Sequence, residues 1–78
     1  MIRLSAPALA RLLPEWRGAV VGGPGYAALA AAVRALVLDG RVALGARLPA
    51  ERDLAGQLGV SRTTVTAAYD TLLSRHEQ

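Results

Sequence analysis

The sequence contains no cysteine and no lysine, and its only histidine is His76. Without cysteine the chain can form neither a disulfide framework nor a thiolate metal site. A single histidine cannot assemble a zinc site or a catalytic triad. Without lysine, no Schiff base with pyridoxal phosphate or a carbonyl substrate can form. We therefore expect a protein that is not an enzyme and that has no cofactor and no metal.

Long apolar runs are also absent. The apolar segment at residues 27–33 stops at Arg34, which is too short to span a bilayer. The apolar N-terminal segment is interrupted by Arg11 and followed by Pro14 and Glu15, unlike a secretory signal peptide. We therefore expect a cytoplasmic protein with no membrane partner.

Phenylalanine is missing too, so the core of this chain must be built from Leu, Val and Ala with a few aromatics. Seventy-eight residues allow one small domain, and such a domain buries little surface unless a partner subunit adds to it. The net charge is +3, and all nine cationic residues are arginine. A moderate positive charge permits nucleic-acid binding but does not demonstrate it.

The spacing within residues 48–73 is that of two short helices around a tight turn. Gly59 is a turn residue that accepts positive φ without a Cβ clash. Ala55 lies four residues before Gly59, where two closely crossing helices need a small side chain, and Leu54 lies five before it. Val65 and Ala68 follow six and nine residues after the glycine, so they fall on the inner face of the second helix. This order predicts a helix-turn-helix.

The outer face of the second predicted helix keeps small and polar side chains. They are Arg62, Thr63, Thr64, Thr66 and Ala67. Arginine and threonine donate hydrogen bonds to phosphates or reach base edges. Ser61 is a good N-cap that would orient the helix end that meets DNA. The pattern favours binding of double-stranded DNA, and the alternative is an ordinary αα-hairpin in a small helical bundle.

A longer helix is predicted over about residues 24–39, where apolar residues recur at spacings of three and four. Its expected inner stripe is Tyr26, Leu29, Ala30, Val33, Leu36 and Val37. Asp39 and Gly40 form its stop. We interpret this helix as scaffold, because its remaining surface is mostly alanine.

The N-terminal region is expected to form an arm. Ser5 followed by Pro7 predicts a short helix that ends at Pro14. Trp16 is expected to cover one edge of the core, with base stacking as the alternative. The glycines around Pro24 follow no strand and precede no lysine, so they predict a linker rather than a nucleotide site. Residues 1–23 are therefore expected to be arm and linker, and residues 24–78 the DNA-binding domain.

The sequence also predicts where the first helix of the helix-turn-helix begins and how Tyr69 packs. Pro49 biases the residue before it away from helical angles, so the first helix should begin after it. Ala50 then occupies the N-cap, where it is a poor choice, while Glu51 and Asp53 in the first turn suit the helix dipole. Tyr69 is expected to pack with its hydroxyl at the rim of the core rather than to stack on a base.

Residues 45–72 read GARLPAERDLAGQLGVSRTTVTAAYDTL. This segment closely resembles the N-terminal winged helix-turn-helix of GntR-type bacterial transcription regulators. The preceding segment, YAALAAAVRALVLDGRV, is similar to the family's first helix. The form Thr-Val-Thr-Ala-Ala-Tyr at residues 64–69 looks most like the MocR branch, in which this domain precedes an aminotransferase-like pyridoxal-phosphate domain. The resemblance covers about two-thirds of the chain.

The resemblance implies DNA contacts at six positions. These are Arg52, Ser61, Arg62, Thr63, Thr64 and Thr66. Arg52 matches the family arginine that contacts the DNA backbone or a guanine, and Thr66 falls where sequence preference is often set. Arg62 is the best candidate for bidentate contact with a guanine edge, which gives about 1–3 kcal/mol of discrimination. The other three side chains are suited to phosphates and to fixing register.

Family domains continue into a two-stranded wing, and this sequence ends at Gln78, where the wing would begin. We expect an all-α, three-helix domain of the winged helix-turn-helix type that lacks most or all of the wing and carries a short N-terminal helical arm. In the full-length context it should act as a homodimer on a repeated or palindromic site. The alternative is a truncated fragment that does not bind DNA and acts through protein–protein contact.

Overall fold

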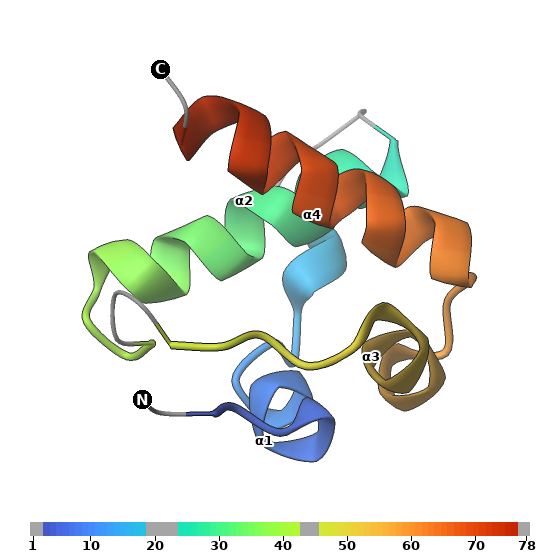
Figure 1. The fold of residues 1–78 in the computed structure, drawn as a ribbon, viewed down its shortest axis with the longest axis horizontal. Coiled ribbons are helices and arrows are strands. Elements are labelled where there is room, and N and C mark those ends of the chain that lie inside the picture. Colours follow the sequence, from blue (N-terminus) through green and yellow to red (C-terminus); the bar gives the residue numbers. More distant parts are fainter. Residues whose placement is uncertain (1–2, 19–23, 43–45, 77–78) are drawn as a thin grey trace.

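The computed structural model describes residues 3–18, 24–42 and 46–76, with the backbone alone for residues 73–76. Within these ranges the chain forms four α-helices and one 3₁₀ helix (Figure 1). In chain order they are α1 (Ala6–Arg11), η1 (Trp16–Gly18), α2 (Gly25–Leu38), α3 (Glu51–Leu58) and α4 (Arg62–His76). The only β pairing among the described residues is an isolated bridge between Arg3 and Arg47. The prediction of an all-α domain with a short N-terminal helix is confirmed.

The helices enclose the core from two sides. Figure 1 shows α2 and α4 on one side and α1 and α3 on the other. Helix α4 packs against both α2 and α3, α1 packs against α3, and η1 packs against α2. Each described helix therefore has a partner that covers its apolar face. None of the described helices is long and apolar enough to span a bilayer.

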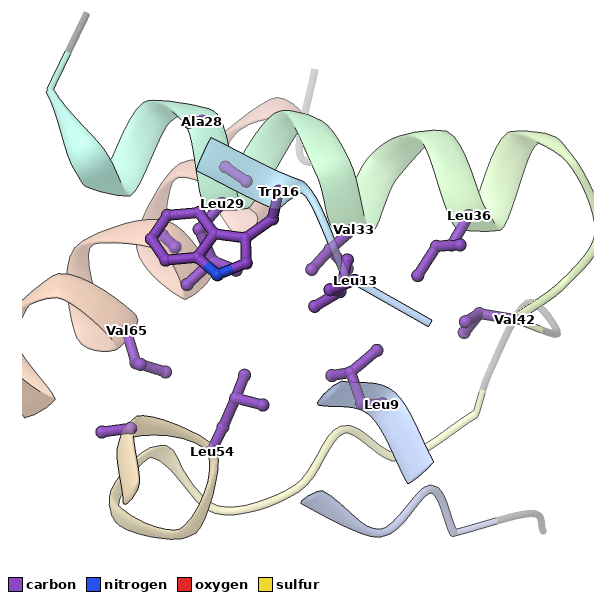
Figure 2. Packing of buried hydrophobic residues seen from close by; sticks show 13 residues of the cluster. Leu9, Leu13, Trp16, Ala28, Leu29, Val33, Leu36, Val42, Leu54 and Val65 are labelled. Carbon is purple, nitrogen blue, oxygen red and sulfur yellow. The ribbon is translucent and has the colours of Figure 1, made fainter. Parts of the chain in front are cut away.

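The core contains buried side chains from each of the described helices (Figure 2). Its largest fully buried side chains are Leu9, Leu29, Leu54, Val33 and Val65. Trp16 belongs to this cluster and only 6% of its surface is exposed, so it packs on the core as predicted. Leu9 comes from α1 and Trp16 from η1, which means that the N-terminal segment shares the core of the helix-turn-helix.

The stripe predicted for α2 is mostly confirmed. Leu29, Val33 and Leu36 are buried, but Tyr26 is 39% exposed, so its placement in the stripe was wrong. Tyr26 lies in the first turn of α2. A periodic pattern identifies the face of a helix, but it does not tell how far along the helix a partner packs.

The ends of the described helices follow their local sequence. In α1 the Ser5 hydroxyl accepts a hydrogen bond from the Ala8 amide at 3.2 Å, as expected of an N-cap. Helix α2 ends as predicted, with Gly40 at φ 78° and its amide bonded to the Val37 carbonyl at 3.1 Å. Helix α3 begins after Ala50, which provides no side-chain cap.

The connection from α2 to α3 was expected to be a short strand or an extended segment. Its described part, residues 46–50, is extended, and the amide of Leu4 donates to the carbonyl of Arg47 at 2.9 Å. The N-terminal segment thus lies beside the chain that leads into α3. The joint predicted at residues 18–25 falls mainly on residues 19–23, outside the described residues.

The two glycines of the helix-turn-helix should respond in opposite directions to alanine. Gly59 ends α3 at φ 72°, where a Cβ is strained, so Gly59→Ala is expected to lower the free energy of unfolding by about 1–2 kcal/mol. Gly56 lies inside α3, and a Cβ added there would meet open space. Gly56→Ala should therefore raise the free energy of unfolding by about 0.5–1 kcal/mol.

Urea denaturation followed by Trp16 fluorescence and circular dichroism measures both values. Gly56→Ala is the matched control, since it adds the same methyl group to the same helix. Equal destabilisation by the two variants would contradict the role given to Gly59.

Candidate nucleic-acid interface

The turn between α3 and α4 brings the two helices into close contact. The amides of Gly59 and Val60 both donate to the carbonyl of Ala55, at 2.9 and 3.1 Å, which closes the end of α3. Ala55 is buried on the inner side of α3, and Val65 is fully buried on α4. The small side chain at residue 55 allows the helices to cross closely. The predicted helix-turn-helix packing is confirmed.

Ser61 caps the start of α4. Its hydroxyl accepts a hydrogen bond from the Thr64 amide at 3.2 Å and lies 3.0 Å from the Thr64 hydroxyl. These bonds satisfy one of the amides that a helix start leaves without an intrahelical partner. The predicted N-cap role of Ser61 is confirmed. The two hydroxyls are thus held together at the end of the helix.

The six residues predicted to contact DNA lie at the starts of α3 and α4. Four of them, Arg52, Ser61, Arg62 and Thr63, are exposed, whereas Thr64 and Thr66 are half-buried. A cleft of about 450 Å³ is lined by Ala50, Glu51, Arg52, Asp53 and Arg62. The structure therefore brings Arg52 of α3 and Arg62 of α4 to one surface.

Glu51 joins the two helices across this surface. Its Oε1 atom accepts a hydrogen bond from the Thr66 hydroxyl at 2.9 Å and lies 3.7 Å from Nε of Arg62. The sequence alone indicates only a helix-dipole role for this glutamate. The sequence features that could have indicated this contact are the acid at the first position of α3 and the arginine at the first position of α4. Their contact depends on how the helices cross, which sequence spacing alone does not give.

Tyr69 ties α4 to the segment that precedes α3. Its hydroxyl donates to the carbonyl of Pro49 at 2.8 Å, and the side chain is half-buried. Burial first, and the charge of Glu51 second, raise the pKa of the Tyr69 hydroxyl to about 12. The predicted placement of this hydroxyl at the rim of the core is confirmed. The bond holds the start of α3 in position against α4.

No group of three or more His, Cys, Asp or Glu side chains that could hold a metal occurs among the described residues. The groups that line this surface are arginine, hydroxyl and carboxylate side chains. A short helix that closely crosses a second helix with a capped, arginine-bearing start is the arrangement of a helix-turn-helix domain.

Comparison with known proteins agrees with this class. The sequence profile described as "Bacterial regulatory proteins, gntR family" matches residues 25–76, from the start of α2 to the end of α4. The chain belongs to the gntR family of bacterial regulatory proteins. A search of curated proteins and a search of solved structures both returned no match. The family is one of DNA-binding regulators.

The raised pKa of Tyr69 gives a pH prediction. In a Tyr26→Phe background Tyr69 is the only tyrosine, and its tyrosinate absorbance should rise with a midpoint near pH 12. Because the pKa is higher in the folded state than the ordinary 10.0, the half-buried neutral phenol stabilises the fold below pH 10. That contribution should be lost as the pH rises from 10 towards 12.

Denaturation at several pH values checks the second part. Between pH 10 and 12 the free energy of unfolding should fall more in the Tyr26→Phe protein than in the Tyr26→Phe/Tyr69→Phe protein. A titration midpoint near 10 in a chain that circular dichroism shows to be folded would refute the proposed environment of the hydroxyl.

Proposed function

We propose that this chain binds DNA in a sequence-specific manner as the DNA-binding domain of a transcription regulator, with the start of α4 in the major groove. The observation on which this depends most is the exposed Arg62 at the first position of α4. The side chain is 66% exposed and borders the same cleft as Arg52. An arginine at this place meets the base edges when the second helix of a helix-turn-helix enters the groove.

The contacts divide into base readout and positioning. Arg62 offers a planar fork of N–H donors that matches O6 and N7 of guanine, so it is assigned to sequence readout. Thr66 lies one helical turn after Arg62 on the same face and is assigned to sequence preference. Arg52, Ser61, Thr63 and Thr64 are assigned to phosphates, where they fix the register of the helix. The alternative for Arg52 is contact with a guanine edge.

The finer placement of the chain rests on its sequence. The Thr-Val-Thr-Ala-Ala-Tyr form of residues 64–69 supports assignment to the MocR branch. The family match begins at residue 25, which supports residues 24–78 as the DNA-binding domain and residues 1–23 as an added arm. One helix in one groove covers half a site, so two copies on a repeated or palindromic site are proposed to give useful affinity. A bacterial regulator of this kind would act in the cytoplasm, where its DNA is.

Arginine substitutions test the two roles separately. A preferred duplex is first selected from a random pool with the wild-type chain, and affinities for it and for a random duplex are then measured. Arg62→Ala should remove about 1–3 kcal/mol of discrimination between them. Arg52→Ala should weaken binding to both and reduce the salt slope by about one.

Arg34→Ala is the matched control, because it removes the same charge from an exposed position on α2. It should leave the preference for the selected duplex intact. Equal losses on selected and random duplexes for Arg62→Ala would refute the division of roles. A folded wild-type chain that enriches no sequence would refute the proposed function itself.

A further inference from the structure

Glu51 places a carboxylate on the surface that is proposed to meet DNA, which is a polyanion. It is the first residue of α3 and lines the same cleft as Arg52 and Arg62. A negative charge at this place repels phosphate groups and lowers affinity for any duplex. Its pairing with Arg62 adds little to the stability of the fold, because the two side chains are 30% and 66% exposed.

The contacts of Glu51 are with two of the side chains assigned to DNA readout. One oxygen, Oε1, accepts a hydrogen bond from the Thr66 hydroxyl at 2.9 Å and lies 3.7 Å from Nε of Arg62. Arg62 and Thr66 are four residues apart on α4, so they share one face of that helix. A single atom of α3 therefore lies beside two neighbouring side chains of α4.

The geometry of the arginine determines what remains for DNA. Glu51 approaches the inner nitrogen, Nε. Among the described residues, the two terminal nitrogens of Arg62 make no side-chain hydrogen bond. Those two nitrogens can therefore contact O6 and N7 of one guanine together. The carboxylate beside Nε also limits the conformations of Arg62, so that less conformational entropy is lost on binding.

We propose that Glu51 is a positioning residue that determines sequence specificity: it orients Arg62 and Thr66 for base contact and opposes contact of Arg62 with phosphate alone. This inference rests on the proposed function of α4 as the recognition helix. On a random duplex a phosphate bound by Arg62 lies close to the Glu51 carboxylate, which repels it. Guanine O6 and N7 carry no net charge, so base contact avoids most of this repulsion. Glu51 thus raises the ratio of specific to random affinity.

The first test is Glu51→Gln, which keeps an oxygen to accept the Thr66 hydroxyl but removes the charge. Affinity for the random duplex should rise about tenfold at low salt, and the slope of log K against log salt should steepen by about 0.9, as one more phosphate contact forms. The ratio of selected to random affinity should fall about tenfold, which lies within the discrimination that one bidentate contact provides.

Asp53→Asn is the matched control. It removes the same charge from the same first turn of α3, and Asp53 makes no hydrogen bond or ion pair with α4 in the described part of the chain. Its effect on the two duplexes should be equal, so that their ratio changes by less than about twofold. If Glu51→Gln and Asp53→Asn shift the ratio alike, Glu51 acts only through net charge and the inference is overturned.

A double-mutant cycle separates positioning from a general structural role. In the Arg62→Ala background, Glu51→Gln should leave the ratio unchanged, because the arginine that responds to the carboxylate charge is gone and Gln still accepts the Thr66 hydroxyl. An equal effect of Glu51→Gln with and without Arg62 overturns the inference. Glu51→Asp keeps the charge but withdraws the carboxylate, so it should lower the ratio without raising affinity for the random duplex.

Folding is checked for each variant by Trp16 fluorescence and circular dichroism. Glu51→Asp keeps an acid at the start of α3, so it decides the matter should the Gln variant fail to fold. A wild-type chain without sequence preference overturns both this inference and the proposed function. A wild-type chain with a clear preference that none of the Glu51 variants alters overturns this inference alone.

Discussion

The structure depends on the close crossing of α3 and α4 at Gly59. The left-handed glycine ends α3 and lets its Ala55 carbonyl accept two turn amides, so that α4 begins immediately in a new direction. Leu54 and Ala55 of α3 are buried in one cluster with Val65 and Ala68 of α4. This packing leaves the starts of both helices on one surface, and every group assigned to DNA contact lies there. The packing between α3 and α4 therefore determines where the side chains assigned to DNA contact lie.

The remaining elements hold that crossing in place. Helix α2 covers α4, while α1 packs against α3 and places Leu9 in the shared core. The segment before α3 is fixed at two points, by the Leu4 amide on the Arg47 carbonyl and by the Tyr69 hydroxyl on the Pro49 carbonyl. Each of these contacts joins residues that are distant in the sequence. A core without phenylalanine thus gains its rigidity from many small apolar contacts and a few directed hydrogen bonds.

The sequence predicted most of the fold because its local patterns agree with its tertiary packing. The Gly59 turn, the Ser61 cap and the buried stripe of α2 follow from backbone preference and periodicity, which neighbouring residues determine. Tyr26 was misplaced because its burial depends on how far along α2 a partner packs. Glu51 was assigned only to the helix dipole, because its contacts with Arg62 and Thr66 arise from the angle between two helices. Spacing predicts which residues face outward, whereas the tertiary structure decides which of them touch.

In the proposed complex the start of α4 contacts the bases while the start of α3 contacts the backbone. Nuclear magnetic resonance of the ¹⁵N-labelled chain, titrated with a selected duplex, tests this most directly. The largest amide shifts should fall on residues 61–66 and on Arg52, with small shifts on α1 and on the second half of α2. Largest shifts on α1 or α2, with residues 61–66 unmoved, would contradict the claim.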